Sequence, residues 1–186
     1  FDYVTINVSS PNTKNLRDLQ KPETLEKILD DVNTINVSLK RKVPIFIKIA
    51  PDLDDSNVTE ILSVCEENNV SGLIATNTTI NPKTLKNPNR FEGGLSGKPL
   101  FNQSNKILRL LAKRKNASTI LIGVGGIFSA SDIYEKIKLG ASAVQIYTGF
   151  VYNGPIHIKK MEMELKNLLL SDGYKSIDGA VGALIR

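Results

Sequence analysis

Runs of β-branched and other apolar residues alternate along the whole chain with segments in which apolar residues recur at helical spacing. Strands are predicted at residues 3–8, 44–49, 72–75, 119–124 and 143–146. Strands that alternate with helices indicate parallel β/α units, because a parallel connection has to cross over one face of the sheet. No Gly/Ser-rich linker or shift in composition interrupts the series, so we expect a single domain.

The segments between these strands carry apolar stripes typical of helices packed on a sheet. The first helix is predicted over residues 22–35, with Pro22 in its first turn, where proline is well tolerated. Ser129 and Asp132 are placed to cap a later helix at its start, and Gly140 to end it. Similar stripes predict helices that include residues 58–65, 107–111 and 158–169. The chain therefore holds five β/α units in tandem.

Five such units are compatible with two architectures. An open, doubly wound sheet can stop at five strands, whereas a closed (β/α)8 barrel needs eight and typically about 250 residues. In the open sheet functional residues gather at one switch point, but in the barrel the carboxyl ends of all strands surround one mouth. Polar or glycine-rich residues follow all five predicted strands, which favours the barrel. They are residues 7–13, Lys48, residues 76–79, residues 125–126 and residues 147–149.

Composition and charge exclude several classes of protein. Hydrophobic residues make up 41% and charged residues 23% of the chain, an ordinary balance for a globular protein. The longest apolar runs are far shorter than the ~20 residues of a membrane-spanning helix. The net charge of +5 is spread along the chain, so no nucleic-acid partner is expected. With one Cys and one His, no metal site is expected either.

Glycine-containing turns follow the last two predicted strands. Gly125 and Gly126 come after one strand, and residues 147–149 (Tyr-Thr-Gly) come after the next. Barrels commonly bind a phosphate group at this place, because glycine lets the backbone N–H groups approach the anion closely. The alternative is that the glycine pair only forms a tight turn. Two such turns in successive units favour the phosphate site.

Polar side chains also stand at the ends of the first three strands. Lys48 lies in an otherwise apolar strand, and a buried ammonium must meet an anion or a wet cavity because its desolvation is costly. The alternative is a lysine at the surface of an edge strand. Asn7, Asn12 and Asn77 carry amides that donate and accept hydrogen bonds, which suits a planar polar heterocycle. Each taken singly is more typical of a turn.

The remaining candidates point away from hydrolytic chemistry. Ser10 has no histidine close by, because the single histidine, His157, lies far along the chain. A Ser-His-Asp hydrolase is therefore not expected. We predict that His157 is an exposed residue of the last helix and that Cys65 packs in the core. The Asn-, Pro- and Gly-rich connection over residues 76–101 is expected to be functional, as long loops in compact domains usually are.

Six short segments match the motifs of one known family in order and spacing. They are residues 7–13, 48–53, 76–79, 93–100, 123–127 and 145–148. Through these segments the chain resembles the dihydroorotate dehydrogenases nearly from end to end. It resembles their class 2, quinone-dependent branch in particular, because Ser10 stands at the catalytic-base position, where class 1 enzymes carry cysteine. The resemblance implies an α/β fold, a (β/α)8 TIM barrel, of which this chain holds roughly the last five β/α units.

The resemblance also implies an activity. This is the FMN-dependent oxidation of dihydroorotate to orotate, with ubiquinone or another quinone as electron acceptor, in de novo pyrimidine (UMP) biosynthesis. Ser10 would be the general base that takes the C5 proton, with Thr13 in a water-linked relay, while a hydride passes to FMN. Lys48 would lie beside the pyrimidine edge of the flavin and stabilise its reduced form.

The implied binding residues fall into two sets. Those for FMN are Asn7, Lys48, Thr76, Ser96, Gly97, Gly125, Gly126, Tyr147 and Thr148. Those for dihydroorotate or orotate are Asn7, Asn12, Asn77 and Thr78. Tyr147 would also face the path of the quinone.

By the same resemblance, residues 1–186 would form the C-terminal part of a single FMN-binding barrel domain whose N-terminal part is absent. The chain starts at Phe1, directly in an apolar strand, which agrees with this expectation. The absent region would carry amphipathic helices that dock on a membrane, either the mitochondrial inner membrane or the bacterial plasma membrane. The isolated chain would leave sheet edges open, so we expect it to be inactive and to bind FMN weakly.

Two alternatives stay open. Another FMN barrel, such as a dihydropyrimidine or dihydrouridine reductase, would share the fold but typically uses a cysteine acid near the position of Ser10. A non-catalytic remnant would keep the motifs without the chemistry.

Overall fold

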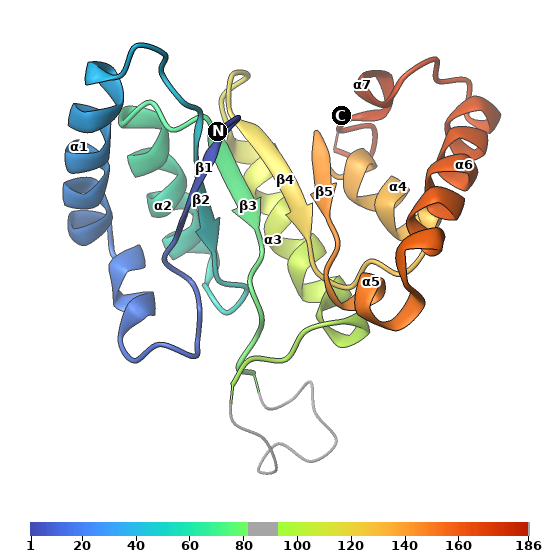
Figure 1. Cartoon of the computed structure of the whole chain (residues 1–186), viewed down its shortest axis with the longest axis horizontal. Coiled ribbons are helices and arrows are strands. Elements are labelled where there is room, and N and C mark those ends of the chain that lie inside the picture. Colours follow the sequence, from blue (N-terminus) through green and yellow to red (C-terminus); the bar gives the residue numbers. More distant parts are fainter. Residues whose placement is uncertain (82–92, 186) are drawn as a thin grey trace.

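A five-stranded parallel sheet forms the centre of the structure. The computed structural model describes residues 1–81 and 93–185. The strands are β1 (Val4–Asn7), β2 (Ile45–Ile49), β3 (Gly72–Ala75), β4 (Ile120–Val124) and β5 (Ala143–Gln145). They pair in chain order from β1 to β5 (Figure 1). In a doubly wound sheet the order reverses at a switch point, so this uninterrupted order is that of a barrel wall, as predicted.

Helices connect the strands and cover the sheet. They are α1 (Pro22–Ser38), α2 (Asp55–Glu67), α3 (Phe101–Arg114), α4 (Ala130–Lys138), α5 (Thr148–Asn153), α6 (Pro155–Ser171) and α7 (Ile177–Ala180). In the described ranges, short 3₁₀ turns form at η1 (Leu16–Gln20) and η4 (Lys98–Leu100). Within the two described ranges, no helix is both long and apolar enough to cross a bilayer.

Side chains of the sheet alternate between its two faces. Ile47 and Leu73 are fully buried in the larger apolar cluster, together with residues of α1, α2 and α3. On the other face a smaller cluster contains Phe46, Ile74 and Ile122. The parallel register explains this separation, because Ile47 pairs with Leu73, and side chains of paired residues point to the same side. The second face corresponds to the interior of a barrel.

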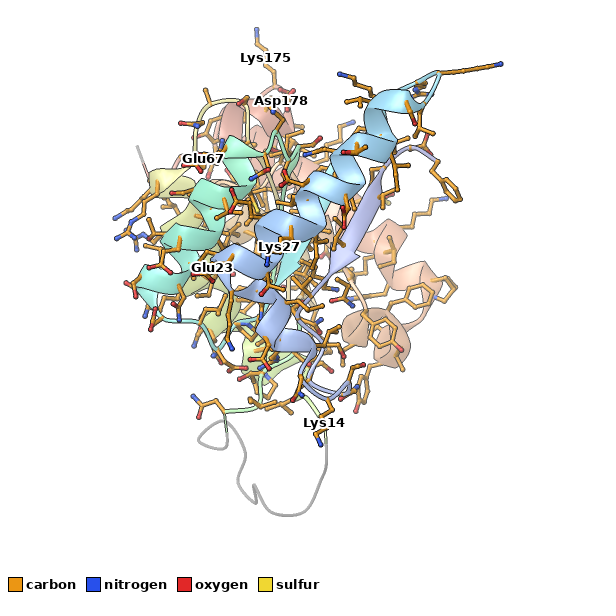
Figure 2. The ribbon with its side chains drawn as sticks, turned by 90° about the vertical axis from the view of Figure 1, so that its left-hand side faces the viewer. Lys14, Glu23, Lys27, Glu67, Lys175 and Asp178 are labelled. Atoms are coloured by element: carbon orange, nitrogen blue, oxygen red, sulfur yellow. The ribbon has the colours of Figure 1, made fainter. Side chains whose placement is uncertain are left out.

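The outer surface of α1 is charged. Glu23 and Lys27 are exposed on the face of α1 that is turned away from the sheet (Figure 2). Leu25 and Leu29, which are fully buried, lie on its opposite face. This amphipathic pattern is what the apolar stripe over residues 22–35 predicted.

The predicted signals at the ends of α4 are confirmed. The Ser129 hydroxyl accepts a hydrogen bond from the backbone N–H of Asp132 at 3.2 Å and caps the helix. The Asp132 carboxylate in turn accepts from the N–H of Phe128 at 2.9 Å. Gly140 has a φ of +108° just after the helix, a conformation that favours glycine. The start of α4 is therefore fixed to the segment that follows β4.

The helix predicted over residues 158–169 is confirmed by α6, but the short helix before it was not predicted. Gly154, with a φ of +73°, separates α5 from α6, and α5 begins at Thr148, where a turn was expected. A helix of six residues is too short to show helical periodicity in the sequence, which is why it was missed.

Of the predictions for Cys65 and His157, to which no catalytic role was assigned, one is confirmed and one is wrong. Cys65 is 1% exposed within the core, as predicted. The prediction that His157 is exposed is wrong, because its side chain is half-buried and its Nε2 lies 2.7 Å from the carbonyl oxygen of Phe128. The reason is tertiary, since α6 packs against α4 and brings His157 beside the segment after β4.

Replacing Leu73 by Ala should lower the free energy of unfolding by about 2–5 kcal/mol, because the buried side chain would leave a cavity. The matched control is Leu170→Ala, at a position that is 58% exposed, where we expect a change of about 0.5 kcal/mol or less. Denaturant unfolding measures the free energy of unfolding of both variants. Equal losses for the two variants would contradict the assignment of the core.

Candidate active site

A cavity of about 240 Å³ lies at the carboxyl ends of the strands. Most of the residues predicted for cofactor and substrate line it. They are Lys48, Thr76, Asn77, Thr78, Ser96, Gly97, Gly125, Gly126, Tyr147 and Thr148. In Figure 1 this edge of the sheet lies at the bottom, where each strand arrow points. The structure thus brings together residues that are up to 100 positions apart in the sequence.

The Gly125–Gly126 turn forms one wall of the cavity. Both glycines have positive φ, +111° and +76°, which residues with side chains rarely adopt. A Cβ atom on Gly126 would lie 2.5 Å from the Cβ of Phe101, so this close approach also requires glycine. The turn therefore leaves backbone uncovered at the cavity, as a phosphate site needs.

A hydrogen bond joins the two other segments beside this turn. The Thr148 hydroxyl donates to the Ser96 hydroxyl oxygen at 2.9 Å and so connects the start of α5 to the segment before η4. Gly97, with a φ of +80°, packs against the Thr148 methyl group. These hydroxyl groups add donors and acceptors to the same end of the cavity.

Lys48 lies on the opposite side of the cavity mouth, on β2. It pairs with Asn7 of β1 in the sheet register. Its side chain is half-buried, and in residues 1–81 and 93–185 the ammonium has no hydrogen bond or ion pair. Burial lowers the pKa of Lys48 below its ordinary value. The prediction that the tip of Lys48 meets a cavity is confirmed.

Three polar side chains form a hydrogen-bonded cluster near Lys48. The Asn77 amide donates to Asn7 Oδ1 and to Ser9 Oγ, both at 3.1 Å. Ser9 Oγ donates to Asn7 Oδ1, also at 3.1 Å. Asn77 Oδ1 accepts from the backbone N–H of Thr78 at 2.8 Å. The two amides are therefore held in one orientation by a buried serine.

The loop after β1 holds the remaining predicted residues, Ser10, Asn12 and Thr13, which do not line the cavity. Ser10 Oγ accepts a hydrogen bond from the backbone N–H of Asn12 at 3.3 Å. Asn12 and Thr13 are exposed, and no hydrogen bond in the described parts of the chain joins Thr13 to Ser10. Gly94 lies in the connection between β3 and α3 and packs against Thr78 of the same connection. A side chain at position 94 would therefore clash with Thr78.

Arg17 joins three of the loops. Its Nε donates to the carbonyl oxygen of Ser9 at 3.0 Å, and its Nη2 donates to the carbonyl oxygen of Thr78 at 2.8 Å. Its Nη1 forms an ion pair with Asp52 at 2.7 Å. One guanidinium therefore connects the loops that follow β1, β2 and β3, a role that suits its planar set of five donors.

Asp52 is the acceptor at the centre of this network. Besides Arg17, its carboxylate accepts from the Thr79 hydroxyl, from the Ile80 N–H at 3.0 Å and from the Gln103 amide at 3.1 Å. Burial alone would raise the pKa of Asp52, but these hydrogen bonds outweigh it and lower the pKa below its ordinary value.

Four residues of this network were not predicted from the sequence: Ser9, Arg17, Asp52 and Gln103. Ser9 is fully buried, yet in the sequence it cannot be distinguished from its neighbour Ser10. A signal existed for the ion pair, because Arg17 and Asp52 are opposite charges in two loops that follow neighbouring strands. In the described part of the chain, no group of three His, Cys, Asp or Glu residues is arranged to hold a metal ion.

Known proteins match this chain along nearly its whole length. The family model for dihydroorotate dehydrogenase matches residues 1–169. A Christiangramia forsetii protein named dihydroorotate dehydrogenase (quinone) is 48% identical over 169 residues, 89% of this chain and 50% of that protein. A Myxococcus xanthus protein of the same name is 44% identical over 183 residues, 98% of this chain and 50% of that protein. The chain spans about half the length of these curated relatives.

Solved structures also resemble this chain over its whole length. The crystal structure of DHODH from Eimeria tenella in complex with ferulenol has a TM-score of 0.94 and 36% identity, over 100% of this chain and 55% of that chain. Its ligand-free form has a TM-score of 0.94, 37% identity and a coverage of 56% of that chain. These neighbours are TIM-barrel enzymes, so the five β/α units described here have the fold of a portion of a (β/α)8 barrel.

Replacing Asp52 by Asn should lower the free energy of unfolding near pH 7 by about 1.5–3 kcal/mol, the usual contribution of hydrogen bonds to a charged group. Because folding lowers the pKa of Asp52, its contribution is fully present above the ordinary pKa of about 4 and is lost as the pH falls further. The variant should therefore lose less stability than the wild type between pH 6 and pH 3.

Denaturant unfolding at several pH values measures this difference. Asp31→Asn, on the exposed face of α1, is the matched control and should follow the wild-type curve. Identical pH dependence for Asp52→Asn and the wild type would show that the ion pair does not stabilise the loops.

Proposed function

The chain belongs to the dihydroorotate dehydrogenase family, and from this we propose that the full-length protein that contains it oxidises dihydroorotate to orotate. We propose FMN as the cofactor, a quinone such as ubiquinone as the electron acceptor, and pyrimidine biosynthesis as the pathway. The names of the relatives support the substrate and the quinone. The observation in the structure that carries the proposal is the cavity at the strand ends, with a glycine turn at one end and Lys48 at the other.

The residues around the cavity fit FMN. The uncovered backbone at Gly125 and Gly126 and the hydroxyl groups of Ser96 and Thr148 suit the phosphate group. Lys48 supplies a positive charge without a protein partner in the described residues, which suits the electron-rich edge of a flavin ring. Further cofactor contacts are assigned to Asn7, Thr76, Gly97 and Tyr147. When bound, FMN would accept the hydride that leaves the substrate.

Ser10 is proposed as the general base that takes the C5 proton at its Oγ. This oxygen accepts from the Asn12 N–H, so the hydroxyl proton stays available for transfer to a relay. A serine hydroxyl is a weak base at neutral pH and needs such a relay, to which we assign Thr13 of the same loop. Arg17 supports this role because it binds the carbonyl oxygen of Ser9 next to Ser10.

The substrate is proposed to bind to the amides of Asn7, Asn12 and Asn77 and to the hydroxyl of Thr78. Dihydroorotate has a planar ring edge with alternating carbonyl and N–H groups, which amides can bind because they donate and accept at once. The hydrogen bonds among Asn7, Ser9 and Asn77 support this assignment, since they hold two of the amides in fixed orientation.

Residues 1–186 are proposed to be the C-terminal part of one FMN-binding barrel domain. The relatives are about twice as long as the chain, which supports this division. A region outside residues 1–186 is proposed to dock on the mitochondrial inner membrane or the bacterial plasma membrane, where quinones reside. Tyr147 lines the cavity and is 78% exposed, which supports the proposal that it faces the quinone path.

Replacing Ser10 by Ala should lower the rate of FMN reduction by dihydroorotate about 100- to 10,000-fold, the usual contribution of a general base. FMN should stay bound, because Ser10 does not line the cavity. Anaerobic stopped-flow absorbance of the flavin in the full-length protein measures the rate.

Ser63→Ala, on the exposed surface of α2, is the control for the Ser10 variant and should reduce at the wild-type rate. An unchanged rate for Ser10→Ala would remove Ser10 from the mechanism. A wild-type flavoprotein that reacts with NADPH but not with dihydroorotate would favour another FMN barrel, and a protein without flavin would favour a non-catalytic remnant.

Replacing Lys48 by Met should weaken FMN binding about tenfold or more, because it removes the positive charge proposed to lie beside the flavin while keeping the length of the side chain. The flavin-to-protein absorbance ratio after gel filtration measures the retained cofactor. Lys42→Met, at an exposed position before β2, should keep the wild-type ratio. Full retention by Lys48→Met would contradict the proposed placement.

A further inference from the structure

A lysine is completely buried behind the Gly125–Gly126 turn. Lys136 of α4 is 0% exposed, and in the parts of the chain that the structure describes it is the only buried Lys, Arg, Asp or Glu. Its ammonium donates to Asn105 Oδ1 at 2.6 Å and to Ser104 Oγ at 2.8 Å, and lies 5.2 Å from the centre of the Phe101 ring. None of these partners is an anion. Burying an ammonium without a direct counter-ion is unfavourable in free energy, so a compensating interaction is expected.

Lys136 is connected to the Gly125–Gly126 turn through Ser104. Since the Ser104 hydroxyl accepts from the ammonium, its own proton points to the carbonyl oxygen of Gly125, at 3.2 Å, or of Phe101, at 3.0 Å. A Cβ atom on Gly125 would lie 3.0 Å from Ser104 Oγ, and one on Gly126 would meet the backbone of Phe101. Lys136, Ser104 and the first turn of α3 therefore form the rear support of the turn.

The front of the same turn lines the cavity. Gly125 and Gly126 face it, whereas Ser104 and Lys136 do not. The contacts that connect the charge to the cavity thus run through Ser104 and the backbone layer of the turn. Because the charge is buried, solvent and salt screen it far less than they screen a surface lysine, and it acts across that layer.

We propose that Lys136 is a positioning residue for a phosphate group in the cavity: through Ser104 it holds the Gly125–Gly126 turn in shape, and its buried charge attracts the phosphate from behind. This inference rests on the proposed FMN site and adds to it a residue that never touches the cofactor. It also supplies the reason for the burial, since a bound phosphate provides the anion that Lys136 otherwise lacks.

The surroundings of Lys136 agree with this role. Burial lowers its pKa to about 7, and the nearby carboxylates of Glu135 and Asp132 partly oppose the shift. The Asn105 amide donates to Glu135 Oε1 at 2.8 Å, so it bridges the ammonium to that carboxylate. A phosphate across the turn would favour the charged form further.

The test compares FMN with riboflavin, which lacks the phosphate group. In the full-length protein that contains this chain, freed of flavin, Lys136→Met should weaken FMN binding about tenfold or more and leave the riboflavin dissociation constant unchanged. Flavin fluorescence titration measures both constants. Met has a similar volume and introduces no new charge, and the thermal unfolding temperature of the flavin-free variant shows whether it folds.

Lys138→Met, also on α4 but partly exposed and paired with Asp172, is the matched control and should keep the wild-type preference for FMN. Loss of affinity for FMN and riboflavin alike, or an unchanged preference, would overturn the role of Lys136. If Lys136→Met does not fold, Ser104→Ala decides: a reduced preference supports the inference and an unchanged one overturns it. A wild-type protein that binds both flavins equally would instead overturn the phosphate site and, with it, this inference.

Discussion

Parallel pairing of the five strands is the constraint on which the rest of the structure depends. Because every strand runs the same way, every connection crosses the outer face as a helix and every strand ends at the same edge. That edge collects the loops after β1 to β5, and the cavity is lined by residues of the loops after β3, β4 and β5 and by Lys48 of β2. The candidate site thus follows from strand direction, and the identity of the loop residues decides its chemistry.

Charges near this edge differ in how they are compensated. Arg17 and Asp52 satisfy each other and hold three loops together, so they serve the shape of the site. Lys48 has no such partner in the described residues and lines the cavity. Lys136 is an intermediate case. Its hydrogen-bond partners are neutral, and one of them contacts the Gly125–Gly126 turn. A buried charge without a counter-ion indicates a further interaction, because its desolvation free energy must be offset by a favourable contact.

Much of the fold could be predicted from the sequence, and part of the site. The strand bounds were predicted to within one residue, since apolar runs between polar loops are a strong local signal. Gly125, Gly126 and Lys48 stood out because each is unusual in its immediate neighbourhood. Ser9 and Arg17 did not, because their importance lies in hydrogen bonds to residues that are distant in sequence. The exposure of His157 was mispredicted for the same reason.

The sequence by itself determined that the chain forms parallel β/α units, which residues follow each strand, and to which family the motifs belong. Only the tertiary structure decided which of those residues share one cavity, that Arg17 joins three loops, and that a lysine of α4 is buried behind the glycine turn. The physical reason is the sequence separation of the residues that interact. Strand and helix patterns arise from contacts between residues close in the chain, whereas burial and hydrogen-bond partners depend on how whole elements pack.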